Sequence, residues 1–92
     1  LRNDTGALWE NYCISERIKL LSYLKSSAQS YFWRTTQQQE IDYIEEMKGM
    51  VAAFEFKYNP LKRARFSKTF LESYNTESTK VITPGNIEEF LL

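Results

Sequence analysis

Residues 40–58 read EIDYIEEMKGMVAAFEFKY, and this stretch predicts a two-stranded β-hairpin that turns at Lys48-Gly49. Successive side chains of a strand point to opposite faces, so a two-residue turn also fixes which residues lie opposite one another. The opposed pairs are Met47 and Met50, Asp42 and Glu55, and Glu40 and Lys57. The hairpin therefore places two carboxylates directly across from each other.

Asp42 and Glu55 should repel each other, because the Cβ atoms of directly opposed residues are only about 4.5 to 5.5 Å apart. A divalent cation held between the two carboxylates would offset this repulsion. Lys57 would lie about 7 Å further along the same strand face, where it could meet a second anion such as a phosphate. The hairpin thus predicts a metal site beside a phosphate site.

The alternative is a solvent-exposed hairpin in which Glu40 and Lys57 form an ordinary cross-strand ion pair. Apolar residues occur on both faces of the second strand: Val51 and Ala53 on one, Phe54 and Phe56 on the other. A strand that is apolar on both faces is typical of the covered interior of a sheet. This pattern favours Glu55 and Lys57 as partly buried charges that need partners.

Composition narrows the class of protein. Ninety-two residues, 42% hydrophobic and 26% charged, predict one small globular domain covering residues 1–92. Because the chain opens with Leu1 rather than Met, we expect it to be a fragment of a longer protein. No apolar run of membrane-spanning length and no signal peptide is visible, so we expect no membrane association.

The single cysteine, Cys13, excludes a disulfide within the chain and favours a cytoplasmic location. The absence of histidine excludes catalytic triads with a His base and most zinc sites. Carboxylates, lysine and backbone groups remain for chemistry. The formal net charge of +0 means that any contact with nucleic acid must be local.

Residues 7–28 predict an amphipathic helix capped at Asp4 or Thr5, with apolar residues such as Ile14 and Ile18 at helical spacing. At about 100° per residue, Glu10 falls at the centre of the apolar stripe. It is either a functional carboxylate that faces the core or an acid favoured by the dipole at the helix start. Arg17 lies on the same stripe, as a buried partner or a side chain that extends outward to water.

The remaining chain predicts the overall order helix, three strands, helix, strand. The expected segments are a strand at 31–34, a loop at 35–39, the hairpin, a helix at 66–74, a strand at 79–83 and a helical turn within 86–92. Asn59-Pro60 should end the third strand, because proline has no donor for the sheet ladder. The apolar end of the tail is expected to close the core or to contact another part of the protein.

Residues 57–68 contain a basic cluster without any acidic residue. Its members are Lys57, Lys62, Arg63, Arg65 and Lys68. By charge alone this is a solvated loop; beside a carboxylate site, Lys62, Arg63, Arg65 and Lys68 become candidate nucleic-acid contacts through phosphate.

Four short motifs together resemble a known family. They are GALWENY at 6–12, YFWRT at 31–35, EID at 40–42 and FEFK at 54–57. In this order they resemble the C-terminal domain of unknown function found after P-loop (AAA-type) ATPase domains in bacteria and archaea. They also resemble the PD-(D/E)xK, restriction-endonuclease-like nuclease superfamily, although Ile41 stands where the superfamily motif has proline.

The resemblance implies an α/β (α+β) fold with a restriction-endonuclease-like core, a mixed sheet flanked by helices in the order α-β-β-β-α-β. It implies Mg²⁺ or Mn²⁺ held by Asp42, Glu55 and the backbone carbonyl of Phe56, with Glu10 as a further carboxylate. Lys57 would complete the catalytic set of Glu10, Asp42, Glu55 and Lys57 by orienting water or stabilising charge on the phosphate. No Gly-rich phosphate loop occurs in the chain, so ATP would bind only in an upstream ATPase domain.

Two functions of different classes follow from the sequence. The first is a Mg²⁺-dependent nuclease-like domain that hydrolyses phosphodiester bonds in DNA. The second is a non-catalytic module of the same fold that recognises DNA or a protein partner for an attached ATPase. The sequence leaves open the oligomeric state, the choice between DNA and RNA, and whether cleavage occurs at all.

Overall fold

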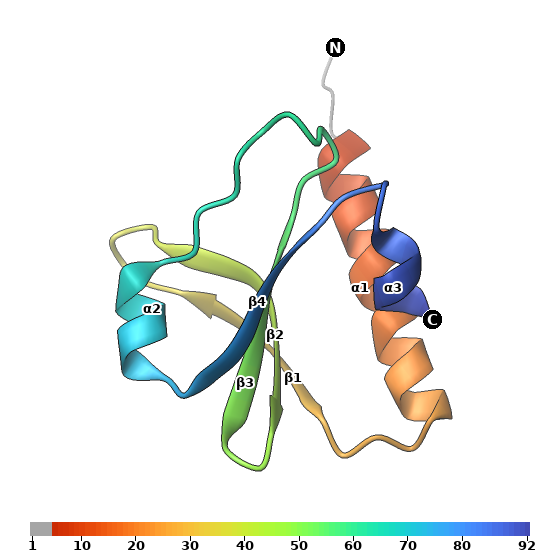
Figure 1. Cartoon of the computed structure of the whole chain (residues 1–92), viewed down its shortest axis with the longest axis horizontal. Helices are drawn as coiled ribbons and strands as arrows, with labels where there is room; N and C mark the ends of the chain where they lie inside the picture. The colour runs from red at the N-terminus through yellow and green to blue at the C-terminus, as the bar shows by residue number, and fades with distance from the viewer. Residues whose placement is uncertain (1–4) are drawn as a thin grey trace.

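One four-stranded sheet, with its strands in the order β1-β2-β3-β4, forms the centre of the molecule (Figure 1). The computed structural model describes residues 5–92. The elements are α1 (Thr5–Tyr23), β1 (Gln29–Arg34), β2 (Glu40–Met47), β3 (Met50–Phe56), α2 (Lys68–Ser73), β4 (Thr76–Ile82) and α3 (Ile87–Leu91). The first three strands are antiparallel, and β4 runs parallel to β3. The predicted mixed α+β class, with a mixed sheet and flanking helices, is confirmed.

The hairpin of β2 and β3 turns at Lys48 and Gly49, as predicted. Both residues have positive φ angles, 54° and 82°, as a tight turn between twisted strands requires. The opposed residues run from Met47 and Met50 to Tyr43 and Phe54, which confirms the predicted register over this length.

Beyond Tyr43 the regular ladder between β2 and β3 stops, so the predicted opposition of Glu40 and Lys57 is wrong. Glu40 pairs with Arg34 on β1 and forms an ion pair with it at 3.2 Å between Arg34 Nη2 and Glu40 Oε2. The backbone N–H of Lys57 donates to Ile82 on β4. The physical reason is an irregularity in β2.

A β-bulge interrupts β2 at Asp42 and Tyr43. Tyr31 of β1 lies opposite Ile44, whereas Trp33 lies opposite Ile41, so two residues of β2 face one residue of β1. Bulges of this kind bend a strand and change the direction of its side chains. Consequently Ile41 and Ile44, three positions apart, belong to the same core cluster.

The sheet is covered on both faces. Phe54, Phe56 and Tyr43 pack beneath α1 and α3, with Phe90 of α3 in the same cluster. On the opposite face, Val51, Ala53 and Ile44 pack against Phe70 of α2 (Figure 1). Each core contains fully buried rings, Tyr43 in one and Phe70 in the other. The prediction that β3 is covered on both faces, and that the tail closes the core, is therefore confirmed.

Several predicted boundaries are wrong by a few residues. The first helix ends at Tyr23 rather than at Ala28, because Lys25 adopts a left-handed conformation with φ 55° and the chain turns into β1. The second helix is shorter than predicted and the fourth strand is longer, beginning at Thr76. Asp4, one of the two predicted cap residues, lies outside the described residues.

The buried face of α1 is narrower than its apolar pattern predicts. Cys13 and Ile14 are buried, but Ile18 is 43% exposed. Arg17 occupies the inward position one turn after Cys13 and forms an ion pair with Glu45 of β2. This part of the helix therefore contacts the sheet through charged groups rather than apolar ones.

Candidate functional site

Three carboxylates from different elements meet where α1 crosses the bulged end of β2. Glu10 comes from α1, Asp42 from β2 and Glu55 from β3. The backbone N–H of Asp42 donates to Glu55 Oε2 at 2.8 Å, and the backbone N–H of Phe56 donates to Asp42 Oδ2 at 2.9 Å. The two carboxylates thus replace the ladder that regular strand pairing would form at this point.

The bulge in β2 explains why Asp42 meets Glu10. Without it, Asp42 would share the face of Ile44, two residues away, and would point toward α2. The extra residue turns Asp42 out of that alternation, and Glu10 and Asp42 line the same cavities. The sequence pattern predicts the opposed pair of Asp42 and Glu55 but carries no signal for this bulge.

Crowding of the three acids changes their protonation. Burial, together with the charge of Asp42 and hydrogen bonding with it, raises the pKa of Glu10 to about 7. The pKa of Glu55 is raised to about 7 by burial and by repulsion from Asp42, against the opposite effects of the Asp42 backbone N–H and of Lys57. Near neutral pH, therefore, the cluster holds protons that ordinary carboxylates have lost.

Lysine side chains border the acidic cluster on one side. Lys57 and Lys62 line a cavity of about 630 Å³ together with Glu10, Glu40 and Asp42. Lys57 follows β3 directly, and Lys62 comes from the loop that leads to α2. Glu55 itself is only 7% exposed. The four residues of the predicted catalytic set thus come together, with Glu55 buried beside the cavity that the other three line.

The other predicted nucleic-acid contacts are more dispersed. Arg65 and Lys68 line a separate cavity with Gln38, Gln39 and Glu40, at the far side of Glu40 from the acidic cluster. Arg63 is exposed on the connecting loop. Of the four predicted nucleic-acid contacts, Lys62 is the one that shares the cavity of Asp42 and Lys57.

The donor atoms of the acidic cluster suit a hard divalent cation, because Mg²⁺ and Mn²⁺ prefer oxygen ligands. Asp42 and Glu55 each accept a backbone N–H through one oxygen, and Glu10 and Glu55 also hydrogen-bond to the carboxyl group of Asp42. Within residues 5–92, no three His, Cys, Asp or Glu side chains are already placed to hold a metal ion. The chemistry of the residues fits such an ion, and binding it would require the carboxyl groups to lose their protons and move apart.

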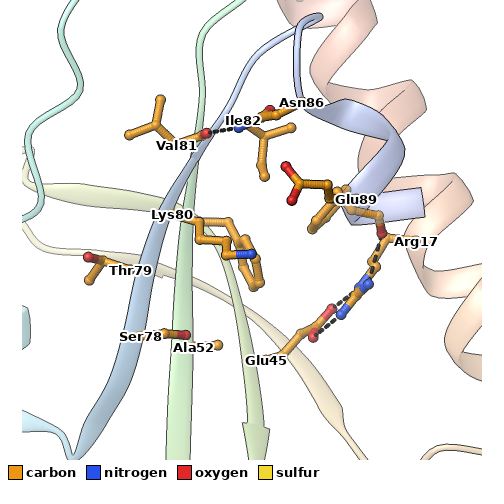
Figure 2. A pocket seen from close by; sticks show the side chains of 12 residues that line it. Arg17, Glu45, Ala52, Ser78, Thr79, Lys80, Val81, Ile82, Asn86 and Glu89 are labelled. Carbon is orange, nitrogen blue, oxygen red and sulfur yellow. Dashed lines mark hydrogen bonds and ion pairs between the residues drawn. The ribbon is translucent and has the colours of Figure 1, made fainter. Parts of the chain in front are cut away.

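Another cavity, of about 590 Å³, lies between β4 and α3 (Figure 2). Arg17 and Glu45 form a two-pronged ion pair at its floor, with 2.7 Å from Nε to Oε2 and 2.9 Å from Nη2 to Oε1. Arg17 Nη1 also donates to the backbone carbonyl of Phe90 at 2.8 Å. The alternative in which Arg17 is a buried partner is therefore confirmed, with Glu45 as the partner rather than Glu10.

This ion pair belongs to a longer buried network. The hydroxyl of Tyr43 donates to Glu45 Oε2 at 2.9 Å and bonds to Ser30 Oγ at 2.8 Å. Burial raises the pKa of Tyr43 above its usual range. Because the charged groups at the cavity floor satisfy one another, the network ties α1, β2 and α3 together. The sequence reasoning missed Glu45, whose signal was a lone acid on the inward face of β2.

Cys13 has the environment of a structural thiol. It is fully buried, and burial raises the pKa of its thiol to about 11. A thiol with such a pKa is a poor nucleophile, because the thiolate is the reactive form. The carboxylates and lysines are the groups through which this site would act.

Comparison of the sequence with curated proteins and with solved structures gives no match. None of the helices described in residues 5–92 is long and apolar enough to cross a membrane. The sequence match to a family covers residues 5–90, which includes α1, α2, all four strands, the acidic cluster and α3 up to Phe90. The chain therefore belongs to the DUF4143 family, a domain of unknown function.

Proposed function

We propose that this chain is a metal-dependent nuclease-like domain that acts on phosphodiester bonds in DNA. The observation that carries the proposal is the meeting of Glu10, Asp42 and Glu55 at a bulge, with the carboxylates of Asp42 and Glu55 bonded to each other's strands. Perturbed pKa values in a cleft are typical of functional sites. An arrangement that only stabilised the hairpin would not need a third acid from α1.

Asp42, Glu55 and the carbonyl of Phe56 would hold Mg²⁺ or Mn²⁺, with Glu10 as an additional carboxylate. The chemistry that such an ion supplies is polarisation of a phosphoryl oxygen and activation of water. Lys57 would orient the attacking water or stabilise negative charge on the phosphate oxygens. Lys62, in the same cavity, would bind a neighbouring phosphate of the DNA backbone.

The restriction-endonuclease-like core and the attachment to a P-loop ATPase are part of the same proposal. The four motifs at 6–12, 31–35, 40–42 and 54–57 support them, as does the position of their acids at one site. Sequencing of the gene upstream of the codon for Leu1 tests the attachment. A GxxxxGK[ST] motif preceding residue 1 is expected, and a complete upstream sequence without one would contradict this part of the proposal.

A non-catalytic recognition module is the second candidate, and one observation favours it. Backbone amides already bond to one oxygen of Asp42 and of Glu55, so the pair is held together by groups of the protein itself. In that case the acids would shape the end of the hairpin, and binding would depend on the lysine-bordered cavity. The two functions make different demands on Lys57.

A cleavage assay separates the two functions. Linear, supercoiled and single-stranded DNA would be incubated with the wild-type chain and Mn²⁺, beside Lys57→Ala as the matched control. The proposal predicts product with the wild type that is absent with the variant. Equal amounts of product, or none from either protein on any substrate, would favour the recognition module.

A further inference from the structure

Phe32 is the most exposed aromatic residue of the sheet, with 73% of its surface accessible. It lies on β1, opposite the bulge of β2 that carries Asp42. Arg34, two residues further along β1, is also exposed. Single exposed apolar side chains are common on protein surfaces, so the feature that distinguishes Phe32 is its place in a cavity with Glu10 and Asp42.

Two adjoining cavities share Phe32 and its neighbour Trp33. The first, of about 380 Å³, also contains Glu10 and Asp42 of the acidic cluster. The second, of about 330 Å³, is lined mainly by aromatic and apolar side chains: Tyr31, Ile44, Val51, Phe70 and Tyr74, with Glu46 at its edge. Phe32 and Trp33 therefore line a cavity that also contains two acids of the cluster.

Trp33 is held in place by its contact with α2. Its ring meets that of Phe70 edge to face, with 5.2 Å between the centroids. Phe70 is 1% exposed and packs in turn against Tyr74 at 4.9 Å. The strand backbone that carries Phe32 is thereby anchored through the neighbouring residue, so that stacking on the Phe32 ring would order little else.

The two sides of the acidic cluster carry different kinds of side chain. Lys57 and Lys62 line the cavity on one side, and Phe32 and Trp33 line the cavity on the other, while Glu10 and Asp42 belong to both. A nucleic acid has the matching division, with an anionic backbone on one side and flat bases on the other. In a duplex the flat faces of the bases are stacked inside, whereas in a single strand they are free to stack on an aromatic side chain.

We propose that Phe32 stacks on a base of a single-stranded nucleic acid whose backbone lies across the acidic cluster toward Lys57 and Lys62. This inference rests on the proposed function, because it names the substrate class of the same site. Single-stranded DNA or RNA, including the unpaired end of a duplex, is then the preferred ligand. Arg34 lines the same cavity as Phe32 and would exchange its exposed ion pair with Glu40 for a phosphate next to the stacked base.

Binding of short fluorescein-labelled oligothymidylate and oligouridylate tests this inference. Fluorescence anisotropy would be measured in Ca²⁺ and again in EDTA. Ca²⁺ binds oxygen ligands but in most metal-dependent sites of this kind does not support turnover. Phe32→Ala should weaken binding of the single strand by about 5- to 150-fold, the range expected for loss of one stacked base. Phe32→Tyr should restore binding, because every aromatic ring offers a face for stacking.

The matched control is Tyr23→Ala, which removes an aromatic residue that is 83% exposed at the end of α1, outside both cavities. It should bind as the wild type does, and duplex DNA of the same sequence should bind more weakly and be insensitive to Phe32→Ala. The proposal is overturned if Phe32→Ala and Tyr23→Ala bind the single strand equally. It is also overturned if neither oligonucleotide binds while the wild type self-associates through Phe32, which would identify a protein contact surface.

This experiment is independent of the cleavage assay. Binding that depends on Phe32, together with no cleavage in Mn²⁺, would support the stacking surface and contradict the nuclease activity. Cleavage that depends on Lys57, with binding indifferent to Phe32→Ala, would support the nuclease activity and contradict the stacking surface. The two proposals therefore fail separately.

Discussion

At the scale of residues, the position of Asp42 depends on one extra residue in β2. The bulge at Asp42 and Tyr43 takes the aspartate out of strand alternation and leaves it beside Glu10. Because the pKa of Glu10 and that of Glu55 are both raised to about 7, protons neutralise part of the negative charge that a bound cation would otherwise neutralise. The state of the cluster should therefore respond to both pH and divalent ions.

Lys57→Ala should abolish metal-dependent cleavage and leave metal binding intact, since Lys57 would act on water and phosphate rather than on the ion. Asp42→Ala should lose both properties. Mn²⁺ binding by titration calorimetry and product formation measured on the same samples check the prediction. Lys48→Ala, at the hairpin turn, is the control that should leave both unchanged. A Lys57→Ala protein that still cleaves would contradict the role given to this lysine.

Without metal, stability should fall as pH rises from about 4.5 to about 7. The folded protein holds the protons of Glu10 and Glu55 more tightly than the unfolded chain, where their pKa is near 4.5. The stabilisation is therefore complete below the unfolded value and lost as pH passes through the folded value. The charged groups around Glu10 and Glu55 are Asp42, Glu40 and Lys57. Of these, Asp42 and Glu40 oppose ionisation of Glu10.

Urea denaturation in EDTA at pH values from about 5 to 8 measures this slope. The double variant Glu10→Gln, Glu55→Gln is the control, because it removes both titrating groups while keeping their shape. It should show a flatter dependence than the wild type over this range. Parallel curves for the two proteins would show that these carboxyl groups do not control stability.

At the scale of elements, a single ion pair connects α1 to the sheet and to α3. Arg17 binds Glu45 of β2 through two nitrogens and the carbonyl of Phe90 through the third, and its guanidinium lies 5.0 Å from the centre of the Phe90 ring. Hydrogen bonding to Glu45 raises the pKa of Arg17, so the pair stays charged. This contact adds to the packing of Phe90 in the core, which also holds α3 against the sheet.

Arg17→Ala should destabilise the protein strongly, by about 3–5 kcal/mol, because it leaves the buried carboxylate of Glu45 without its partner. Lys19→Ala is the matched control: its pair with Glu16 is exposed and should contribute no more than about 1 kcal/mol. Chemical denaturation of both variants checks the prediction. Similar losses from the two substitutions would contradict a special role for the buried pair.

At the scale of the whole molecule, the acidic cluster joins α1 to the hairpin of β2 and β3, so a ligand bound there should stabilise the entire fold. A ligand that binds only the folded state adds about 2.7 kcal/mol at a hundredfold excess over its dissociation constant. Mn²⁺ or Mg²⁺ should therefore raise the melting temperature of the wild type. Asp42→Ala should melt at the same temperature with and without the ion. A wild-type midpoint that does not change in Mn²⁺ would leave the cluster as a structural feature.

The sequence by itself determined the elements that depend on local chemistry. The tight turn at Lys48-Gly49, the hairpin register and the two apolar faces of β3 follow from turn residues and strand alternation, which act over a few residues. The inward position of Glu10 follows in the same way from helical periodicity. The end of α1 did not, because pairing of Gln29 and Ser30 with β2 overrides the local helical pattern.

Only the tertiary structure decided how the acids meet. The bulge that turns Asp42 toward α1 arises from the fit of β2 between β1 and β3, and the pairing of Arg17 with Glu45 joins residues 28 positions apart. Neither has a signature within a short window of sequence, because each depends on which surfaces are buried against one another. The protonation of Glu10 and Glu55 follows from the same burial, since the cost of removing a charge from water exists only in the folded chain.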